Sequence, residues 1–234
     1  MINFFRKIRQ SLLTENKFGK YLIYAVGEII LVVIGILIAI SINNWKESLE
    51  LKTIERQVYN DVLQELRTDL AEIQDKHRDN QNHLSRFHYG SEIILNDSQM
   101  KLADTLGLIA MELTQFSDFN KNKTTYDALA ESGKLELITN KNILRQLQQL
   151  GNHYNYINRL EKNNEQFVFM TIPKLFDYIR MNPFKVIKPE ELYSYQFHNT
   201  IEAFIHIGEE KDRLYEQAKK NLDNLIVLLE KELE

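Results

Sequence analysis

The chain has 234 residues, of which 44% are hydrophobic and 26% are charged, and its formal net charge is −4 at pH 7. This composition excludes a disordered chain. The basic residues form no extended patch, so no nucleic-acid partner is predicted. Cysteine is absent, which excludes disulfides, thiolate nucleophiles and cysteine-ligated metals. With only 8 glycines and 3 prolines, the chain is poor in turn residues, so a helical fold is expected.

Residues 1–20 form a basic segment that begins MINFFRKIRQSLL. Phe5, Ile8 and Leu12 recur there at helical spacing beside basic side chains. This pattern is typical of a short amphipathic helix on the anionic inner leaflet of a membrane. A charged leader without fixed structure is the alternative interpretation. We assign residues 1–20 to a cytoplasmic basic amphipathic segment.

An almost unbroken apolar run, YLIYAVGEIILVVIGILIAISI, extends from Tyr21 to Ile42. About 20 helical residues are enough to cross a hydrocarbon core of roughly 30 Å. The aliphatic residues outweigh the cost of Glu28, which is about 3 kcal/mol on the insertion scale. Aromatic residues that favour membrane interfaces stand at both ends, namely Tyr21, Tyr24 and Trp45. The run predicts a transmembrane helix over residues 21–44.

The residues around the span predict its orientation. Five basic residues precede it, namely Arg6, Lys7, Arg9, Lys17 and Lys20. Basic residues after the span are diluted by acidic ones, so the positive-inside rule places the N-terminus in the cytoplasm. A cleaved signal peptide is the alternative, because Ala39 and Ser41 have the spacing of a cleavage site. The apolar run is longer than a signal h-region of about 7 to 15 residues, which favours an uncleaved anchor.

Glu28 lies on one stripe of the predicted span together with Val32, Gly35 and Ala39, since a helix turns by about 100° per residue. Gly35 and Ala39 form a small-xxx-small pair, which lets two membrane helices approach closely. Glu28, Gly35 and Ala39 are therefore candidate membrane-helix contacts, with a second copy or with another membrane protein. A glutamate that snorkels or protonates without consequence is the alternative.

Residues 45–234 are predicted to form an extracytoplasmic antiparallel helical bundle, so the fold class is all-α with one transmembrane helix continuing into the bundle. Helical patterns run from the span toward Phe87, from Gln99 to Leu113 and from Asn140 to Ile179. Gly90 and residues 96–98 are expected to interrupt the first helix. Thr200 is expected to cap the last helix.

Further breaks are predicted between these helices. Residues 115–123 are expected to be a connector, and Pro173 is expected to kink the third helix. NPFKVIKPEEL, residues 182–192, reads as a loop that restarts a helix at Pro189. Glu65, Asp69 and Glu72 share one helix side and are expected to form a solvated acidic face, with a cation site as the alternative.

The stretch TTYDALAESGKLELITN, residues 124–140, is the densest local signal. Thr124 can cap a short helix that Gly133 ends in the left-handed conformation. The apolar residues that follow would then fold back on those before the turn. A capped helix with a packed turn explains the stretch, and a partner surface is the functional alternative. The candidate residues are Tyr126, Asp127, Leu129, Ser132, Gly133, Leu135 and Leu137.

Three stretches of the chain together resemble a family of uncharacterised single-span membrane proteins of Gram-negative bacteria, catalogued as a domain of unknown function. They are the N-terminal 45 residues, TYDALAESGKLELITN and LRQLQQLGNHY. The resemblance implies an inner-membrane anchor, with a cytoplasmic N-terminus and a helical periplasmic domain. It implies no known reaction, cofactor or catalytic residue.

No catalytic, cofactor-binding or metal-binding residue is predicted. The chain has no Glu-x-x-His, no G-x-S-x-G and no P-loop. The six histidines show no zinc spacing and are expected to be surface or satisfied core residues. The predicted function is a membrane-anchored helical interaction module, either a structural or assembly partner in the envelope or a ligand-sensing domain, and not an enzyme. The rival interpretation is an extracytoplasmic hydrolase or metalloenzyme whose site is assembled from several helices.

Overall fold

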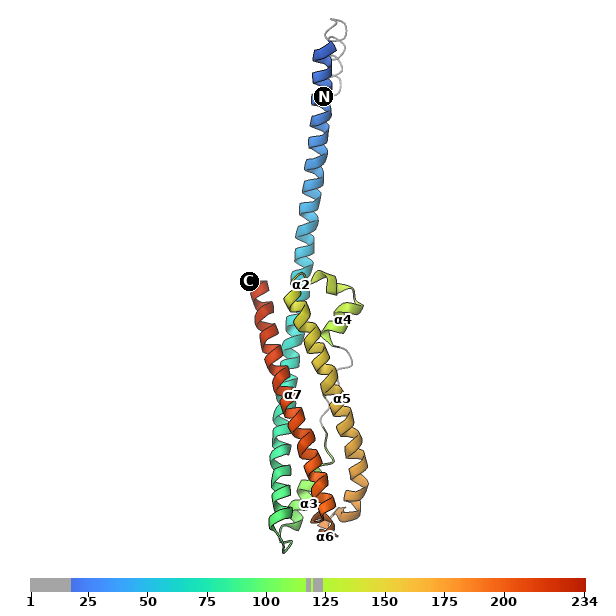
Figure 1. The fold of residues 1–234 in the computed structure, drawn as a ribbon, viewed down its shortest axis with the longest axis vertical. Coiled ribbons are helices and arrows are strands. Elements are labelled where there is room, and N and C mark those ends of the chain that lie inside the picture. The colour runs from blue at the N-terminus through green and yellow to red at the C-terminus, as the bar shows by residue number, and fades with distance from the viewer. Residues whose placement is uncertain (1–17, 117–118, 120–123) are drawn as a thin grey trace. The chain divides into compact units, whose positions relative to one another are not determined.

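The computed structural model describes residues 18–116, 119 and 124–234. Residues 1–17 of the predicted amphipathic segment, and most of the expected connector 115–123, lie outside the described residues. Two compact units meet in the sequence between Ile54 and Glu55. The all-α class is confirmed, since almost all the regular structure is helical (Figure 1). The elements are α2 (Phe18–Asn96), α3 (Ala103–Glu112), α4 (Thr125–Glu131), the 3-10 helix η1 (Lys134–Leu137), α5 (Lys141–Tyr178), β1 (Ile179–Met181), β2 (Phe184–Val186), α6 (Pro189–Leu192) and α7 (Tyr195–Leu233).

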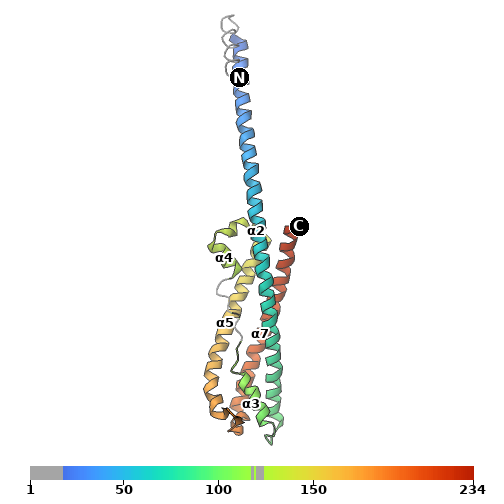
Figure 2. The same cartoon turned by 180° about the vertical axis from the view of Figure 1, so that it is seen from behind.

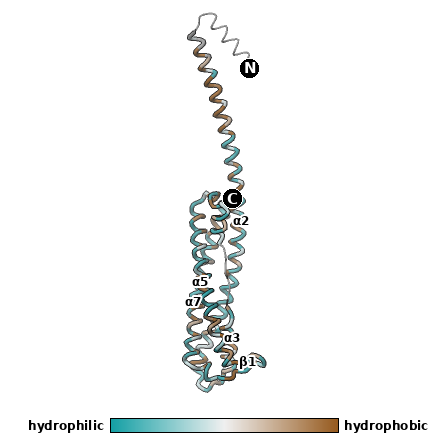
Figure 3. Tube along the Cα trace, turned by 90° about the vertical axis from the view of Figure 1, so that its right-hand side faces the viewer, coloured by the Kyte–Doolittle hydropathy of each residue, from teal (hydrophilic) through white to brown (hydrophobic). Residues whose placement is uncertain are grey.

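In the first unit, the described chain is the beginning of α2, which contains a long apolar stretch. Its large aliphatic side chains between Leu22 and Ile42 are 47–73% exposed, and Figure 3 shows the same stretch as strongly hydrophobic. The helix is long and apolar enough to cross a membrane. A surface of this kind is unfavourable in water, because about 25 cal/mol is lost for each Å² of apolar area left hydrated.

In the second unit, α5 and α7 pack against the later part of α2 as a bundle of long helices. Figures 1 and 2 show α7 antiparallel to both α2 and α5, whereas α2 and α5 run in the same direction. A parallel pair requires a return along the bundle between them. α3 and α4 lie at opposite ends of the bundle.

Two apolar cores fill the bundle. The first core joins α2, α5 and α7 where their periodic apolar faces meet, and it includes Leu66, Ile73, Leu147, Leu150, Leu222 and Leu225. The second core lies toward the other end and adds α3 and the β-hairpin, with Leu106, Ile109, Val168, Leu175, Ile201 and Phe204. Each fully buried aliphatic side chain contributes about 1.5–3 kcal/mol. The apolar residues spaced three and four apart thus form the buried helix faces that the sequence predicted.

A short β-hairpin stands where the sequence predicted a loop. β1 and β2 pair antiparallel, with Ile179 opposite Val186, and Ile179 and Val186 belong to the second core. A Cβ atom on Gly107 of α3 would lie 2.5 Å from a methyl group of Val186, so this glycine lets α3 approach the hairpin closely. Pro189 begins α6 as predicted.

Two predicted helix boundaries are wrong. α2 continues through Gly90 to Asn96, because Gly90 serves close packing: a Cβ there would lie 3.0 Å from a methyl group of Ile109. α7 begins before Thr200, since the Ser194 hydroxyl accepts a hydrogen bond from the Phe197 amide at 3.2 Å. Thr200 instead donates to the Gln196 carbonyl inside the helix. Gly90 and Thr200 therefore both lie inside helices, and neither marks a helix boundary.

The predicted caps around α4 and α5 are confirmed. The Thr124 hydroxyl accepts from the Asp127 amide at 3.2 Å, which starts α4. Gly133 has φ 69° and turns the chain into η1. The Asn140 side chain accepts from the amides of Asn142 and Ile143, which starts α5. Local sequence therefore sets these helix ends.

We predict that Gly133→Ala lowers the free energy of unfolding by about 1–2 kcal/mol, because a left-handed residue with a Cβ is strained. Apart from Gly133 and its two chain neighbours, no described atom lies within 4 Å of the added Cβ, so a clash does not contribute. Gly133→Asn is the matched control and should lose less, since asparagine tolerates this conformation. Urea unfolding of the full-length protein in detergent, followed by circular dichroism, measures both. Equal stability of the wild type and the alanine variant would contradict the prediction.

Candidate functional site

A layer of buried polar residues lies between the two apolar cores. We define this polar layer as His77 and Asn80 of α2, Glu161 and Asn164 of α5, and Lys211 of α7, all of which are buried. Charged side chains rarely occupy such positions unless they are paired. The layer therefore interrupts the apolar core at one level of the bundle.

Glu161 and Lys211 form the charged centre of the polar layer. Their side chains are 4% and 8% exposed, and the Lys211 ammonium lies 3.5 Å from a Glu161 carboxylate oxygen. The Tyr215 hydroxyl donates a hydrogen bond to the other carboxylate oxygen. Burial lowers the pKa of Lys211, the charge of Glu161 opposes this effect, and nearby Lys76 lowers the pKa further. The pair joins α5 to α7 in a low-dielectric environment.

Two further contacts join α2 to α7 in the same layer. His77 Nε2 lies 2.8 Å from a carboxylate oxygen of Asp212. The Asn80 amide donates to the Gly208 carbonyl at 2.8 Å. A Cβ on Gly208 would lie 2.8 Å from a methyl group of Leu84. Glycine is needed there because α2 and α7 approach each other closely.

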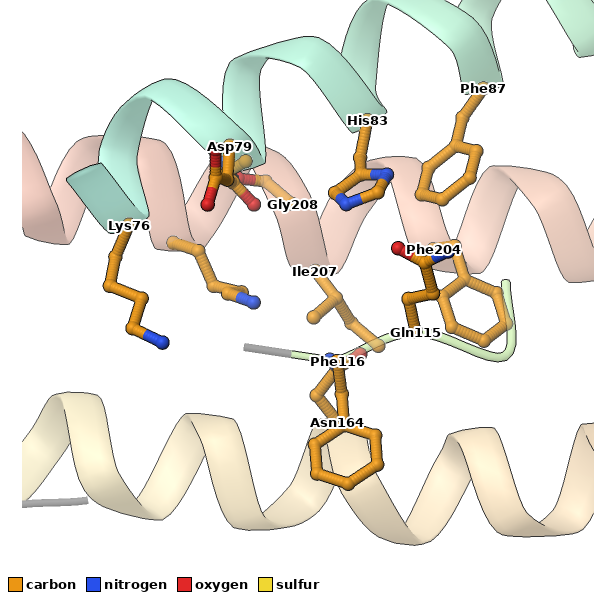
Figure 4. A pocket seen from close by; sticks show the side chains of 12 residues that line it. Lys76, Asp79, His83, Phe87, Gln115, Phe116, Asn164, Phe204, Ile207 and Gly208 are labelled. Atoms are coloured by element: carbon orange, nitrogen blue, oxygen red, sulfur yellow. The ribbon is translucent and has the colours of Figure 1, made fainter. Parts of the chain in front are cut away.

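A cavity of about 180 Å³ opens beside the polar layer (Figure 4). It lies among α2, α5 and α7, with Gln115 and Phe116 from the chain after α3 along one side. The polar lining includes Lys76, Asp79, Asn80, His83, Asn164 and Lys211, and the apolar lining includes Phe87, Phe116, Phe204 and Ile207. A cavity with apolar walls and a few convergent polar groups is the usual form of a small-molecule site.

Several groups in this lining can donate hydrogen bonds to a ligand. Lysine and amide groups supply hydrogen-bond donors, and lysine offers no lone pair when protonated. Among the described residues, no group of three or more histidine, aspartate or glutamate side chains is placed to hold a metal ion. The carboxylate of Glu161 is engaged by Lys211 and Tyr215.

The predicted membrane-helix contacts lie in the first unit. Glu28 is half-buried, and Gly35 and Ala39 are exposed. No side chain or distant backbone atom lies within 4 Å of a Cβ built on Gly35. The stripe is therefore uncovered at Gly35, and its role in helix contact stays a prediction.

The predicted motif of residues 124–140 forms a packed cap on the first core. Leu129 is buried there, and Tyr126, Leu135 and Leu137 pack against the same cluster. Asp127 accepts from the Thr124 hydroxyl at 2.8 Å, and Ser132 donates to the Leu129 carbonyl. These contacts explain the motif structurally, and a partner-binding role stays a prediction.

The expected solvated acidic face is wrong at Asp69, which is 1% exposed. Glu65 is exposed and Glu72 is half-buried. Asp69 turns inward because it lies next to the apolar stripe that contains Leu66 and Ile73. Its charge acts on Tyr154 of α5: burial raises the pKa of Tyr154, and the Asp69 carboxylate raises it further.

The polar layer was not predicted, although the sequence carries a signal for it. Glu161 lies one turn after Ile157 on the inward face of α5, and Lys211 lies between Gly208 and Leu214 on that of α7. Charged residues at inward positions of two helices indicate a buried pair. Pairing them required knowing which levels of the two helices face each other.

The comparison with known proteins identifies a family whose function is unknown. The family model described as "Family of unknown function (DUF6090)" matches residues 28–169, more than half of the chain. No curated protein and no solved structure matches the chain.

We predict that Lys211→Met lowers the free energy of unfolding by about 3 kcal/mol or more, because it leaves Glu161 buried without its cation. The double variant Lys211→Met/Glu161→Gln removes the buried charge and keeps an acceptor for Tyr215. It should recover more than half of the loss. Urea unfolding of the full-length protein in detergent measures both variants. A Lys211→Met protein as stable as wild type would show that the pair is not required for folding.

We also predict opposite effects for two tyrosines at pH 7. No described group meets the distance and angle of a hydrogen bond with the buried Tyr154 hydroxyl, although the Asp69 carboxylate is close enough to raise its pKa. Tyr154→Phe should therefore stabilise the protein by about 1 kcal/mol. Tyr59 donates to Glu55 at 2.8 Å, so Tyr59→Phe should destabilise it by about 1 kcal/mol. Chemical denaturation at pH 7 compares the two variants, and equal shifts would contradict the prediction.

The dependence of the unfolding free energy on alkaline pH provides a second test of Tyr154→Phe. The unfolded-state tyrosine pKa is about 10, and the folded-state pKa of Tyr154 is higher. Above pH 10 the unfolded state therefore binds fewer protons, and stability falls as the pH rises. Tyr154→Phe should make this fall less steep.

Proposed function

Since the chain belongs to the DUF6090 family, whose function is unknown, we propose from its own sequence and structure that it is a membrane-anchored helical module. It acts by binding another protein rather than by catalysis. The anchor lies in the inner membrane of a Gram-negative bacterium, with the N-terminus in the cytoplasm and the bundle in the periplasm.

The observation that carries this proposal is the exposed apolar beginning of α2. None of the most apolar window of this helix is buried within the protein. Only an apolar surrounding satisfies such a surface, and a lipid bilayer supplies one over the length of about 20 residues. The basic residues that precede the span support a cytoplasmic N-terminus.

A stripe of the anchor is suited to contact with another membrane helix. Gly35 and Ala39 give a flat surface four residues apart, and Glu28 lies on the same side. A carboxyl group in lipid gains from a hydrogen bond across a helix contact, because water is absent. The occupant is a second copy of this chain or another membrane protein.

The bundle also exposes apolar side chains, which supports a binding role. Phe169 and Phe176 of α5 are 57% and 53% exposed. With exposed Pro173 between them, they follow one helix face at positions i, i+4 and i+7. The Phe116 ring packs on Phe169, with 6.0 Å between ring centroids, and thus extends this face. Large apolar side chains grouped on one face are typical of interaction surfaces.

We predict that a photo-crosslinking residue at Val32, on the Glu28 stripe, captures a membrane protein in native membranes. A crosslinking residue at Leu37, about 180° away from Glu28, should capture far less. Mass spectrometry of the adduct identifies the partner. Glu28→Leu should reduce capture by about tenfold, which corresponds to the loss of a contact of about 1.4 kcal/mol.

The matched control is Glu47→Leu, which removes the same charge at an exposed position beyond the predicted span. It should leave capture at Val32 unchanged. If crosslinking yields only the monomer in the wild type, in Glu28→Leu and in Glu47→Leu, the proposed contact through the span is wrong. Recovery of the wild type in the soluble fraction would overturn the anchor itself.

A further inference from the structure

We propose that the cavity beside the polar layer is a binding site for a small organic anion, namely a carboxylate with an apolar body. This inference goes beyond the interaction module proposed above and does not depend on its anchor or on its membrane partner. The cavity is built from residues of the second unit alone, and its charges, its donors and its walls each favour such a ligand.

Two ammonium groups favour an anion. Lys76 and Lys211 both line the cavity, and they repel each other, since the charge of Lys76 disfavours the charged form of Lys211. Glu161 compensates Lys211, whereas Lys76 makes no ion pair within 4.0 Å with a described residue. An anion between the two ammonium groups would relieve this repulsion and gain charge-assisted hydrogen bonds.

An unused buried amide points to the same site. Asn164 is 5% exposed, lines the cavity and makes no hydrogen bond with another described residue. Figure 4 shows it across the cavity from Lys76 and His83. A buried amide is most stable where its hydrogen-bonding groups have a partner. A carboxylate oxygen would accept from its NH₂ group.

The carboxylates near the cavity do not cancel its positive charge. Asp79 lines the cavity but is exposed, so water and salt screen it. Glu161 already accepts from Tyr215 and pairs with Lys211. His83 faces Glu112 at 3.5 Å.

The size and walls of the cavity restrict the ligand. Its volume of about 180 Å³ is below the range of about 300–1,000 Å³ that is typical of sites for drug-sized ligands. Phe87, Phe204 and Ile207 supply apolar lining, with Phe87 and Phe204 on the side away from Lys76. A compact carboxylate with an aromatic or branched aliphatic body fits both features.

The test uses phenylacetate as the probe and the full-length protein in detergent micelles. Isothermal titration calorimetry should show saturable binding at one site. The neutral analogue 2-phenylethanol and the cation 2-phenylethylammonium have the same apolar body. Both should bind at least about tenfold more weakly, because they lack the charge-assisted hydrogen bonds to the lysines.

Two variants test the assigned residues. Lys76→Met should weaken phenylacetate binding by about tenfold or more without lowering the melting temperature, since it removes a repulsion. Asn164→Leu should also weaken binding while the fold is retained, because no protein hydrogen bond is lost. Lys162→Met is the matched control, since Lys162 is exposed on α5 and does not line the cavity. It should bind phenylacetate like the wild type.

Three results would overturn the proposal. The first is the absence of saturable phenylacetate binding. The second is equal binding of the acid, the alcohol and the amine, which would indicate partition into the detergent or a purely apolar site. The third is unchanged affinity in both Lys76→Met and Asn164→Leu, which would place the anion elsewhere on the protein.

Discussion

The buried pair of Glu161 and Lys211 is the interaction on which the bundle architecture depends. Two charges inside a protein are stable only when they meet each other and when their remaining donors and acceptors are satisfied. The pair lies at the level where α5 faces α7, and Tyr215 satisfies the second carboxylate oxygen. His77 and Asn80 then bind α2 to the same level through Asp212 and the Gly208 carbonyl.

The polar layer also separates two kinds of apolar core. The first core is covered by α4 and η1, and the second core is covered by α3 and the β-hairpin. Between them, the cavity is lined by the three long helices together with Gln115 and Phe116. The bundle is thus stabilised at its two ends by apolar packing and keeps a polar space in the middle. The same arrangement that holds the charged pair provides a place for a ligand.

The two parts of α2 have different surfaces. The first part of α2 carries aliphatic side chains on every face, as a helix in lipid requires. From Val58 onward only one face is apolar, because α2 then packs against α5 and α7 on one side and meets solvent on the other. At the start of the second unit, Glu55 accepts from the Thr139 amide at 2.9 Å. This contact ties α2 to the turn before α5.

The sequence by itself determined the helical class, the apolar segment and the local ends of α4 and α5. Those features depend on composition, on periodicity and on residues such as Thr124, Gly133 and Asn140 that act within one turn. Only the tertiary structure decided the role of Gly90, the inward position of Asp69 and the pairing of Glu161 with Lys211. These depend on which helices meet and at which level, and a residue's spacing along its own helix carries no information about the level of its neighbour.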